Sequence, residues 1–327
     1  MLFVNKDDER RAFDLAYRSH DQWTITPGES PDFICLRHGQ PILGVEVTEL
    51  WQHETDARLS KIGGYFDSLL DGGEVAHKDD RYVAKVETIQ LLPRDSLDPI
   101  AEIPAIMRKH PSPAERAKLL DAALAGKEKR VSGYLSRCGH VDLLIDDRSM
   151  LFWFSEFELL IRPISSDPVR ERVTRSEFRE VFLLTYAEGG GRVRIPLKAS
   201  LLMEDLGVLE DLLSEEAPEL SEQLYSVTRS SPVAVSVLIA AVGHLGHVLP
   251  AACVEDGRLG ISIGCVTLHW TSQGKVVRDY TCMPEQVAFA PDRLSSSSDV
   301  DRIARRIAER RSAYHATISF AFPVAAP

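Results

Sequence analysis

The stretch PDFICLRHGQPILGVEVTEL, residues 31–50, predicts a β-hairpin that carries acidic side chains on both of its strands. Residues 32–36 and 42–50 are rich in apolar and β-branched side chains, which favour strands. The His-Gly-Gln sequence between them indicates a tight turn. Because strand side chains alternate between the two faces, this hairpin can bring Asp32 of the first strand beside Glu46 of the second.

Two carboxylates on one face of a sheet are costly unless a cation joins them. Mg²⁺ and similar hard cations, such as Mn²⁺, prefer oxygen ligands, and one or two carboxylates with waters and a phosphate are typical. We therefore expect Asp32 and Glu46 to bind a metal ion, with the main-chain carbonyl of Val47 as a third ligand.

Helices and strands are also expected on either side of the hairpin. A helix from about Asp7 to Ser19 and a short strand at 23–26 precede it. A capping box with Pro113 at the first helical position predicts a helix over 112–137. Apolar strands follow at 141–146 and 181–186, and a Gly-rich turn leads back through 193–197.

This order of helix, three-strand meander, helix and strand resembles the core of the PD-(D/E)XK (restriction-endonuclease-like) nuclease superfamily. The family motif has an Asp at the start of the second strand and (Asp/Glu)-x-Lys in the third, matched here by Asp32 and by Glu46-Val47-Thr48. A Glu on the first helix of many members corresponds to Glu9. The resemblance implies an α/β fold, a Mg²⁺-dependent nuclease activity and a nucleic-acid partner, with DNA favoured over RNA.

Thr48 stands where the family motif has its lysine. That lysine orients or polarises the attacking water and stabilises charge on the phosphate, and some members supply the base from the following helix. Lys127 lies on the apolar stripe of the helix over 112–137, at helical spacing from Leu120, Leu124 and Val131. We expect Lys127 to replace the missing lysine, with Lys61 as the reserve candidate.

Each of these residues also has an ordinary structural interpretation. Asp32 follows a proline and suits a turn, Glu9 suits an exposed first helical turn, and Lys127 suits the edge of a core. A Glu inside an apolar strand is disfavoured, so Glu46 fits such an interpretation least well. The prediction of a catalytic site rests on the residues as a set.

The charge distribution gives conflicting indications about a nucleic-acid partner. The formal net charge of −11 counts against one. Residues 107–137, however, hold eight Lys or Arg against three acids. This pattern is typical of a solvated helix face, but it also fits contacts to phosphates. The expected contacts are Arg116, Lys118, Lys129 and Arg130. A second basic segment, 302–311, is a further candidate.

The composition changes near residue 200, which predicts two domains. Residues 1–200 form the nuclease-like domain, with an insertion at about 52–112, and residues 201–327 form a smaller α+β accessory domain. Within the insertion we expect a helix from Asp56 to Leu70, a strand at 82–92 and a proline-containing linker up to Pro113. The accessory domain begins with acidic helices, continues with strands near 259–270 and 275–281, and ends in a basic helix. A protein partner or a second copy of the chain would bind there.

The sequence also favours a cytoplasmic protein without a membrane segment. The first residues lack the pattern of a signal peptide. The apolar stretch at 232–252 is interrupted by Gly and His, so it fits a buried helix better than a membrane span. The five cysteines are odd in number and scattered, which fits a reducing compartment.

Three other functions compete with the nuclease prediction. A nuclease-fold protein that has lost catalysis and binds a protein partner would account for Thr48 and for the acidic net charge. A small-molecule enzyme or sensor built around residues 230–290 has no motif to support it. His244 and His247 with Cys253 and Cys265 could form a zinc site, but the irregular spacing favours packing.

Overall fold

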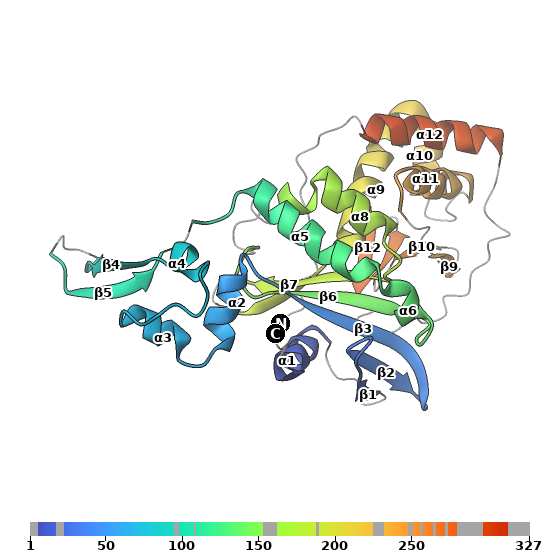
Figure 1. Ribbon diagram of the computed structural model, residues 1–327. Coiled ribbons are helices and arrows are strands. Elements are labelled where there is room, and N and C mark those ends of the chain that lie inside the picture. Colours follow the sequence, from blue (N-terminus) through green and yellow to red (C-terminus); the bar gives the residue numbers. More distant parts are fainter. Residues whose placement is uncertain are drawn as a thin grey trace.

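The computed structural model describes residues 6–17, 23–94, 98–107, 109–152, 162–187, 190–224, 232–247, 251–255, 258–263, 266–271, 274–279 and 297–312. It confirms a mixed α/β protein, with a six-stranded sheet of order β1-β2-β3-β6-β7-β8 (Figure 1). The strands are β1 (Thr24–Pro27), β2 (Phe33–Arg37), β3 (Gln40–Leu50), β6 (Val141–Asp147), β7 (Val181–Tyr186) and β8 (Arg192–Pro196).

The first three strands form an antiparallel meander, and β6 and β7 then run parallel to β3. β8 returns antiparallel to β7. Parallel strands covered on both faces have near-continuous apolar sequences, and β6 and most of β7 are buried along their length. The predicted order of helix, three-strand meander, helix and strand is present in the chain.

Helices cover both faces of this sheet. The elements are α1 (Lys6–Ala16), α5 (Pro113–Glu128), α6 (Val131–Leu135) and α8 (Asp167–Arg175). Phe13 of α1 packs in one cluster with Val45 and Val47, whereas Leu120 and Leu124 of α5 pack in another on the opposite face. In Figure 1, α5 and α8 lie above the sheet and α1 lies below it.

The helix expected over 112–137 is divided into α5 and α6. Its start is as predicted, because the Ser112 side chain accepts from the Glu115 N–H and the Glu115 side chain accepts from the Ser112 N–H. Near its end the N–H of Arg130 donates to the carbonyl of Lys127, three residues back, at 3.0 Å. This tightened turn ends the α-helical pattern between Lys127 and Val131.

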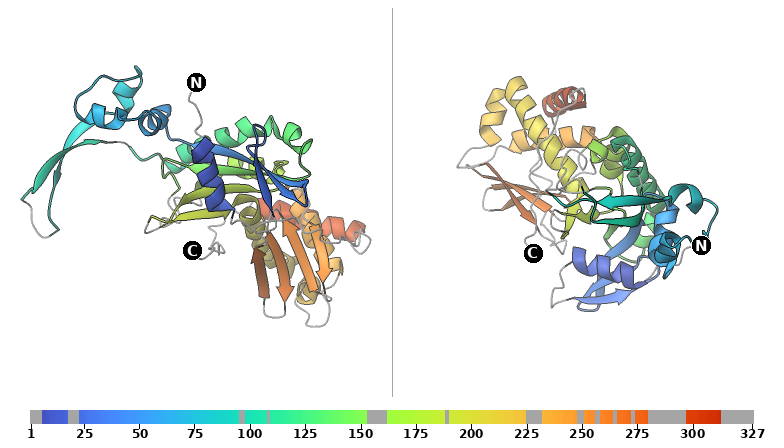
Figure 2. Two further views of the ribbon diagram at one scale, coloured as in Figure 1. Left: turned by 90° about the horizontal axis from the view of Figure 1, so that it is seen from below. Right: turned by 90° about the vertical axis from the view of Figure 1, so that its left-hand side faces the viewer.

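The insertion between β3 and α5 is a separate arm at one side of the sheet (Figure 2). It contains α2 (Glu54–Lys61), α3 (Tyr65–Leu70), α4 (Asp80–Val83), β4 (Val86–Leu91) and β5 (Ala101–Ile106). The single helix expected from Asp56 to Leu70 is interrupted where Gly64 adopts φ 71°. β5 lies in a stretch expected to be a linker, and it pairs antiparallel with β4.

A buried carboxylate holds the base of the arm together. Asp80 accepts hydrogen bonds from Thr55 at 2.8 Å, Arg58 at 3.0 Å and Tyr65 at 2.7 Å. Charge-assisted hydrogen bonds are stronger than neutral ones, so this set links α2, α3 and α4 although their apolar cluster is small.

The C-terminal part contains α9 (Leu197–Glu216), α10 (Pro218–Leu224), α11 (Pro232–His244) and α12 (Ser298–Ser312). It also contains an antiparallel sheet of β9 (Ala251–Glu255), β10 (Arg258–Ile263), β11 (Val266–Thr271) and β12 (Gly274–Asp279). The strand expected at 259–270 is therefore two strands joined by a reversal.

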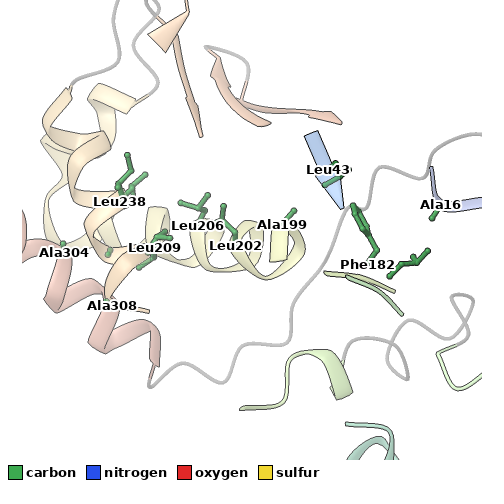
Figure 3. Close-up of a cluster of buried hydrophobic side chains, with 14 of the residues drawn as sticks. Ala16, Leu43, Phe182, Ala199, Leu202, Leu206, Leu209, Leu238, Ala304 and Ala308 are labelled. Atoms are coloured by element: carbon green, nitrogen blue, oxygen red, sulfur yellow. The ribbon is translucent and has the colours of Figure 1, made fainter. Parts of the chain in front are cut away.

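The boundary expected near residue 200 falls inside α9. Ala199, at the start of this helix, belongs to the same buried cluster as Phe182 of the main sheet. Further along α9, Leu209 packs in that cluster with Leu238 of α11 and Ala304 of α12 (Figure 3). The two expected domains therefore share one continuous hydrophobic core through α9.

None of the helices within the described residues has the length and apolar character needed to cross a bilayer. The apolar stretch beginning at Pro232 forms α11, which is 13 residues long. Its side chains Val237, Leu238 and Val242 are buried in the shared core, as expected for a core helix.

Candidate metal centre and nucleic-acid interface

The hairpin brings Asp32 next to Glu46, as the sequence predicts. Phe33 pairs with Val45, so Asp32 lies opposite the next residue of β3. One carboxylate oxygen of Asp32 accepts a hydrogen bond from the main-chain N–H of Val47 at 2.8 Å. Both acids are buried, Asp32 being 7% exposed and Glu46 3%. The fixed main chain of β3 therefore orients the Asp32 carboxylate.

Lys127 reaches the same place from α5. Its ammonium nitrogen lies 2.5 Å from Oε1 of Glu46 and 3.1 Å from the carbonyl oxygen of Val47. These are two of the three groups that we expect to bind a metal. The lysine therefore occupies a position between α5 and β3 from which it interacts with the expected metal ligands.

Glu9 of α1 joins the cluster with a lysine that sequence reasoning did not single out. Glu9 is only 6% exposed. The ammonium of Lys6 lies 3.2 Å from Oε2 of Glu9 and 3.5 Å from Oδ1 of Asp32. The ion pair between Lys6 and Glu9, three residues apart on one helix, could be predicted from the sequence. The contact of Lys6 with Asp32 could not, because it depends on the tertiary fold.

The carboxylates of this cluster disfavour one another's ionised form. Burial raises the pKa of Glu46, and the nearby charge of Asp32 raises it further, while Lys127 lowers it. Burial and Asp32 likewise raise the pKa of Glu9, against the opposing effect of Lys6. With all three carboxylates and both ammonium groups ionised, the formal charge of the cluster is −1, which favours a further cation.

Tyr134 of α6 completes the surroundings of Glu46. Burial and the Glu46 charge raise the pKa of the Tyr134 hydroxyl to about 12, so the hydroxyl near Glu46 stays protonated at neutral pH. Oε2 of Glu46 is buried and has no partner of good hydrogen-bond geometry among the described residues. A buried charged oxygen without such a partner is unfavourable and is a suitable cation ligand.

These donors fit a hard divalent cation. The Asp32 and Glu46 carboxylates and the Val47 carbonyl supply only oxygen, the donor that Mg²⁺ and Mn²⁺ prefer. Within the part of the chain that the structure describes, no group of three or more His, Cys, Asp or Glu side chains is placed to hold a metal. The metal ligands expected here include only two such side chains, Asp32 and Glu46, because the third ligand is the main-chain carbonyl of Val47.

Thr48 and Lys61 contribute differently from Lys127. Thr48 is half-buried and follows Glu46 by two positions, so both side chains point to the same face of β3. Lys61 forms an ion pair with Glu49, which points to the opposite face. The structure therefore does not bring the reserve lysine to the Asp32–Glu46 cluster.

The basic segment presents three of its four expected phosphate contacts to solvent. Lys118, Lys129 and Arg130 are exposed along α5 and just after it. Arg116 is a correction, because it is 2% exposed and its Nε donates to the carbonyl of Pro111 at 3.0 Å. Its guanidinium stabilises the segment that enters α5 and is not displayed on the surface.

An arginine outside the segment increases the positive potential of this surface. Arg172 of α8 lies 2.5 Å from a carboxylate oxygen of Asp121 and 2.7 Å from one of Glu128. Two of the three acids in the basic segment are therefore compensated locally. We call the exposed residues Lys118, Lys129 and Arg130 the α5 basic surface.

The second basic segment does not present free positive charge. Each of its arginines contacts a carboxylate: Arg302 contacts Asp299, Arg305 contacts Asp301, Arg306 contacts Glu216, Arg310 contacts Glu215 and Glu216, and Arg311 contacts Glu204 and Asp205. Ion pairing of this kind cancels most of the field that would attract a polyanion. This observation removes the main argument for a second nucleic-acid contact there.

The histidines considered for a zinc site also serve other contacts. His247 lies 2.6 Å from Asp205, and His244 lies 3.0 Å from Asp301. Cys265 lies outside the described residues, and so does the side chain of Cys253. The described part of this arrangement supports the packing interpretation.

Comparisons with known proteins do not assign the chain to a family. No family model matches the sequence, and searches of curated proteins and of solved structures find no similar protein. The contacts of Asp32, Glu46 and Lys127 are therefore the basis for assigning a function.

Proposed function

We propose that this protein is a metal-dependent nuclease with a PD-(D/E)XK-type active site on a restriction-endonuclease-like core. The observation that carries the proposal is the position of Lys127, 2.5 Å from Glu46 and 3.1 Å from the Val47 carbonyl. A lysine from the following helix thereby stands beside the acids of the motif, although β3 itself has Thr48. DNA is the favoured substrate because the resemblance favours it over RNA.

The residues have distinct roles in this proposal. Asp32, Glu46 and the Val47 carbonyl would hold Mg²⁺ or Mn²⁺, which supplies a more acidic bound water and neutralises phosphate charge. The hydrogen bond from the Val47 N–H keeps Asp32 oriented. Lys127 stabilises the charge that develops on the scissile phosphate and orients the attacking water. Glu9 and Lys6 supply a second ion pair beside Asp32.

A second function is favoured by the same contacts. Lys127 and Lys6 already compensate most of the carboxylate charge. A site that needs no metal for its stability could belong to a nuclease-fold protein that has lost catalysis. Such a protein would act as a protein-binding or regulatory module, and the arrangement of Glu46 and Lys127 would be structural.

A cleavage assay distinguishes the two functions. The full chain is incubated with supercoiled plasmid, single-stranded DNA or RNA in Mg²⁺, in Mn²⁺ or in EDTA. We expect cleavage of at least one substrate with a divalent metal and none in EDTA, because the metal is required to activate water. Intact substrates in all metal conditions would contradict the nuclease proposal and favour the regulatory module.

The α5 basic surface is expected to bind the nucleic-acid backbone. Replacing Lys118, Lys129 and Arg130 by Gln should weaken binding by a similar factor for all sequences. The slope of log affinity against log salt should fall by almost one unit for each phosphate that the variant no longer neutralises. Fluorescence anisotropy with labelled DNA measures both effects, with Ca²⁺ present to prevent cleavage.

The matched control removes arginines whose charge is already compensated. Arg302→Gln with Arg305→Gln should change the affinity and its salt dependence little, since each side chain pairs with an aspartate on its own helix. Equal weakening by both sets of substitutions would mean that net charge, and not the α5 surface, determines binding.

A further inference from the structure

A cavity lies at the carboxyl ends of the parallel strands. It measures about 360 Å³, and residues of α1, of the ends of β6 and β7, and of the start of β8 line it. Its charged and aromatic lining is Arg11, Trp51, Asp146, Arg148, Tyr186 and Arg192. We call it the carboxyl-edge cavity. α1 lies below the sheet and α2 follows the end of β3 in Figure 1.

This cavity is separate from the Asp32–Glu46 cluster. Asp146 of its lining is the register partner of Glu49. Because Glu46 and Glu49 are three positions apart on one strand, their side chains point to opposite faces of the sheet. Ligands of open α/β sheets commonly bind outside the carboxyl ends of the strands, which is where this cavity lies.

Cations dominate the lining. Three guanidinium groups face a single carboxylate, Asp146, which pairs with both Arg148 and Arg192. The two other acids nearby are already engaged, Asp8 with Arg148 at 3.5 Å and Glu49 with Lys61. The lining therefore keeps an excess of positive charge, which favours an anionic ligand.

Two of the arginines, Arg11 and Arg192, have N–H donors without a partner among the described residues. Arg11 is exposed at the cavity, and the described residues offer it no hydrogen bond or ion pair. Nε of Arg192 is buried without a partner among the described residues, although its Nη2 donates to the carbonyl of Leu184 at 3.0 Å. Arginine donors in a planar fork match the geometry of phosphate oxygens.

Flat aromatic and guanidinium groups line the same cavity. The Arg192 guanidinium lies 4.2 Å from the centroid of the Tyr186 ring, and that of Arg148 lies 5.9 Å from the Trp51 ring. Nucleobases stack on aromatic rings and on arginine planes alike. The cavity volume of about 360 Å³ is within the usual range for small-molecule sites.

We propose that the carboxyl-edge cavity binds a 5′-phosphorylated nucleoside. The phosphate contacts Arg11 and Arg192, and the base stacks against the planar groups around Trp51 and Tyr186. This inference does not depend on the proposed nuclease activity, because it uses none of the residues of the Asp32–Glu46 cluster.

The same chemistry is available from a free mononucleotide or from the 5′ end of a nucleic-acid strand. An adjoining cavity of about 420 Å³ shares Trp51 and Arg148 and adds Lys109 and His110. A nucleic-acid strand bound by its 5′ end would extend into this adjoining cavity, whereas a mononucleotide would not reach it.

The test is calorimetric titration of the full chain with 5′-AMP, adenosine and inorganic phosphate in EDTA. We expect 5′-AMP to bind more tightly than either of its parts. Arg11→Gln should weaken binding of 5′-AMP about tenfold, the usual effect of losing a hydrogen bond to a charged group. Arg10→Gln is the matched control and should bind normally, because Arg10 pairs with Asp14 on the same helix.

A fluorescence measurement tests the stacking contact. Bound 5′-AMP should quench part of the tryptophan emission, and Trp51→Phe should remove that quenching. A 5′-phosphorylated hexanucleotide that binds more tightly than both 5′-AMP and its 5′-hydroxyl form identifies a strand end as the ligand; otherwise the ligand is a free nucleotide. No binding of 5′-AMP or of the phosphorylated hexanucleotide, or equal loss in the Arg10 and Arg11 variants, would overturn the proposal.

Discussion

Lys127→Met is expected to reduce phosphodiester cleavage by a factor of about 10² or more, the usual scale for losing a positioned base or charge stabiliser. The side chain contacts Glu46 and the Val47 carbonyl directly, and Thr48 offers no charge in its place. Methionine preserves the apolar stem that packs between α5 and the sheet. Single-turnover cleavage with saturating Mg²⁺ measures the chemical step without a contribution from product release.

Lys129→Met is the matched control for this experiment. Lys129 is exposed and lies at the end of α5, so its loss should affect the affinity for nucleic acid and its salt dependence, but not the chemical step. The two lysines differ by two residues and have the same charge, which separates position from net charge. If Lys129→Met were the more damaging substitution, the assignment of Lys127 as the catalytic lysine would be wrong.

Local sequence patterns were sufficient to predict the order of the elements that precede and follow the insertion in the first half of the chain. The β2–β3 hairpin has alternating faces and a Gly-containing turn, and the apolar strand β6 can only be a central strand. β5 was missed because Pro104 and its exposed side chains resemble a linker. Pairing with β4 defines that strand, and such pairing is a non-local property.

In the candidate site too, features set by local sequence spacing were predicted, and contacts made only by the tertiary fold were not. Helical spacing placed Lys127 on the face of α5 that meets the sheet, because the apolar stripe determines which side is buried. The same spacing puts Arg116 on that stripe, four residues before Leu120, so its burial agrees with the helical pattern. Its partner, the Pro111 carbonyl, lies in the preceding irregular segment and could not be inferred from that pattern. Lys6 was missed because its contact with Asp32 joins residues that only the tertiary fold brings together.

The metal centre itself is tested by thermal unfolding. Mg²⁺ or Mn²⁺ should raise the Tm of the native protein by a few degrees at about a hundredfold excess over Kd, because a ligand that binds only the folded state stabilises it. Asp32→Asn should abolish this shift and leave the metal-free fold intact. The asparagine keeps a carbonyl oxygen that can accept from the Val47 N–H, as Asp32 does at 2.8 Å.

Lys127→Met should have the opposite effect on the metal-induced shift. The Lys127 ammonium occupies contacts with Glu46 and the Val47 carbonyl that a metal would share, so its removal eliminates a competing cation. It also leaves Glu46 beside Asp32 with less compensating charge, which makes a divalent ion more favourable there. The shift in Tm should therefore be larger in Lys127→Met than in the native protein, although cleavage is abolished or nearly so. An unchanged shift in Asp32→Asn, or a smaller one in Lys127→Met, would place the metal elsewhere in the molecule.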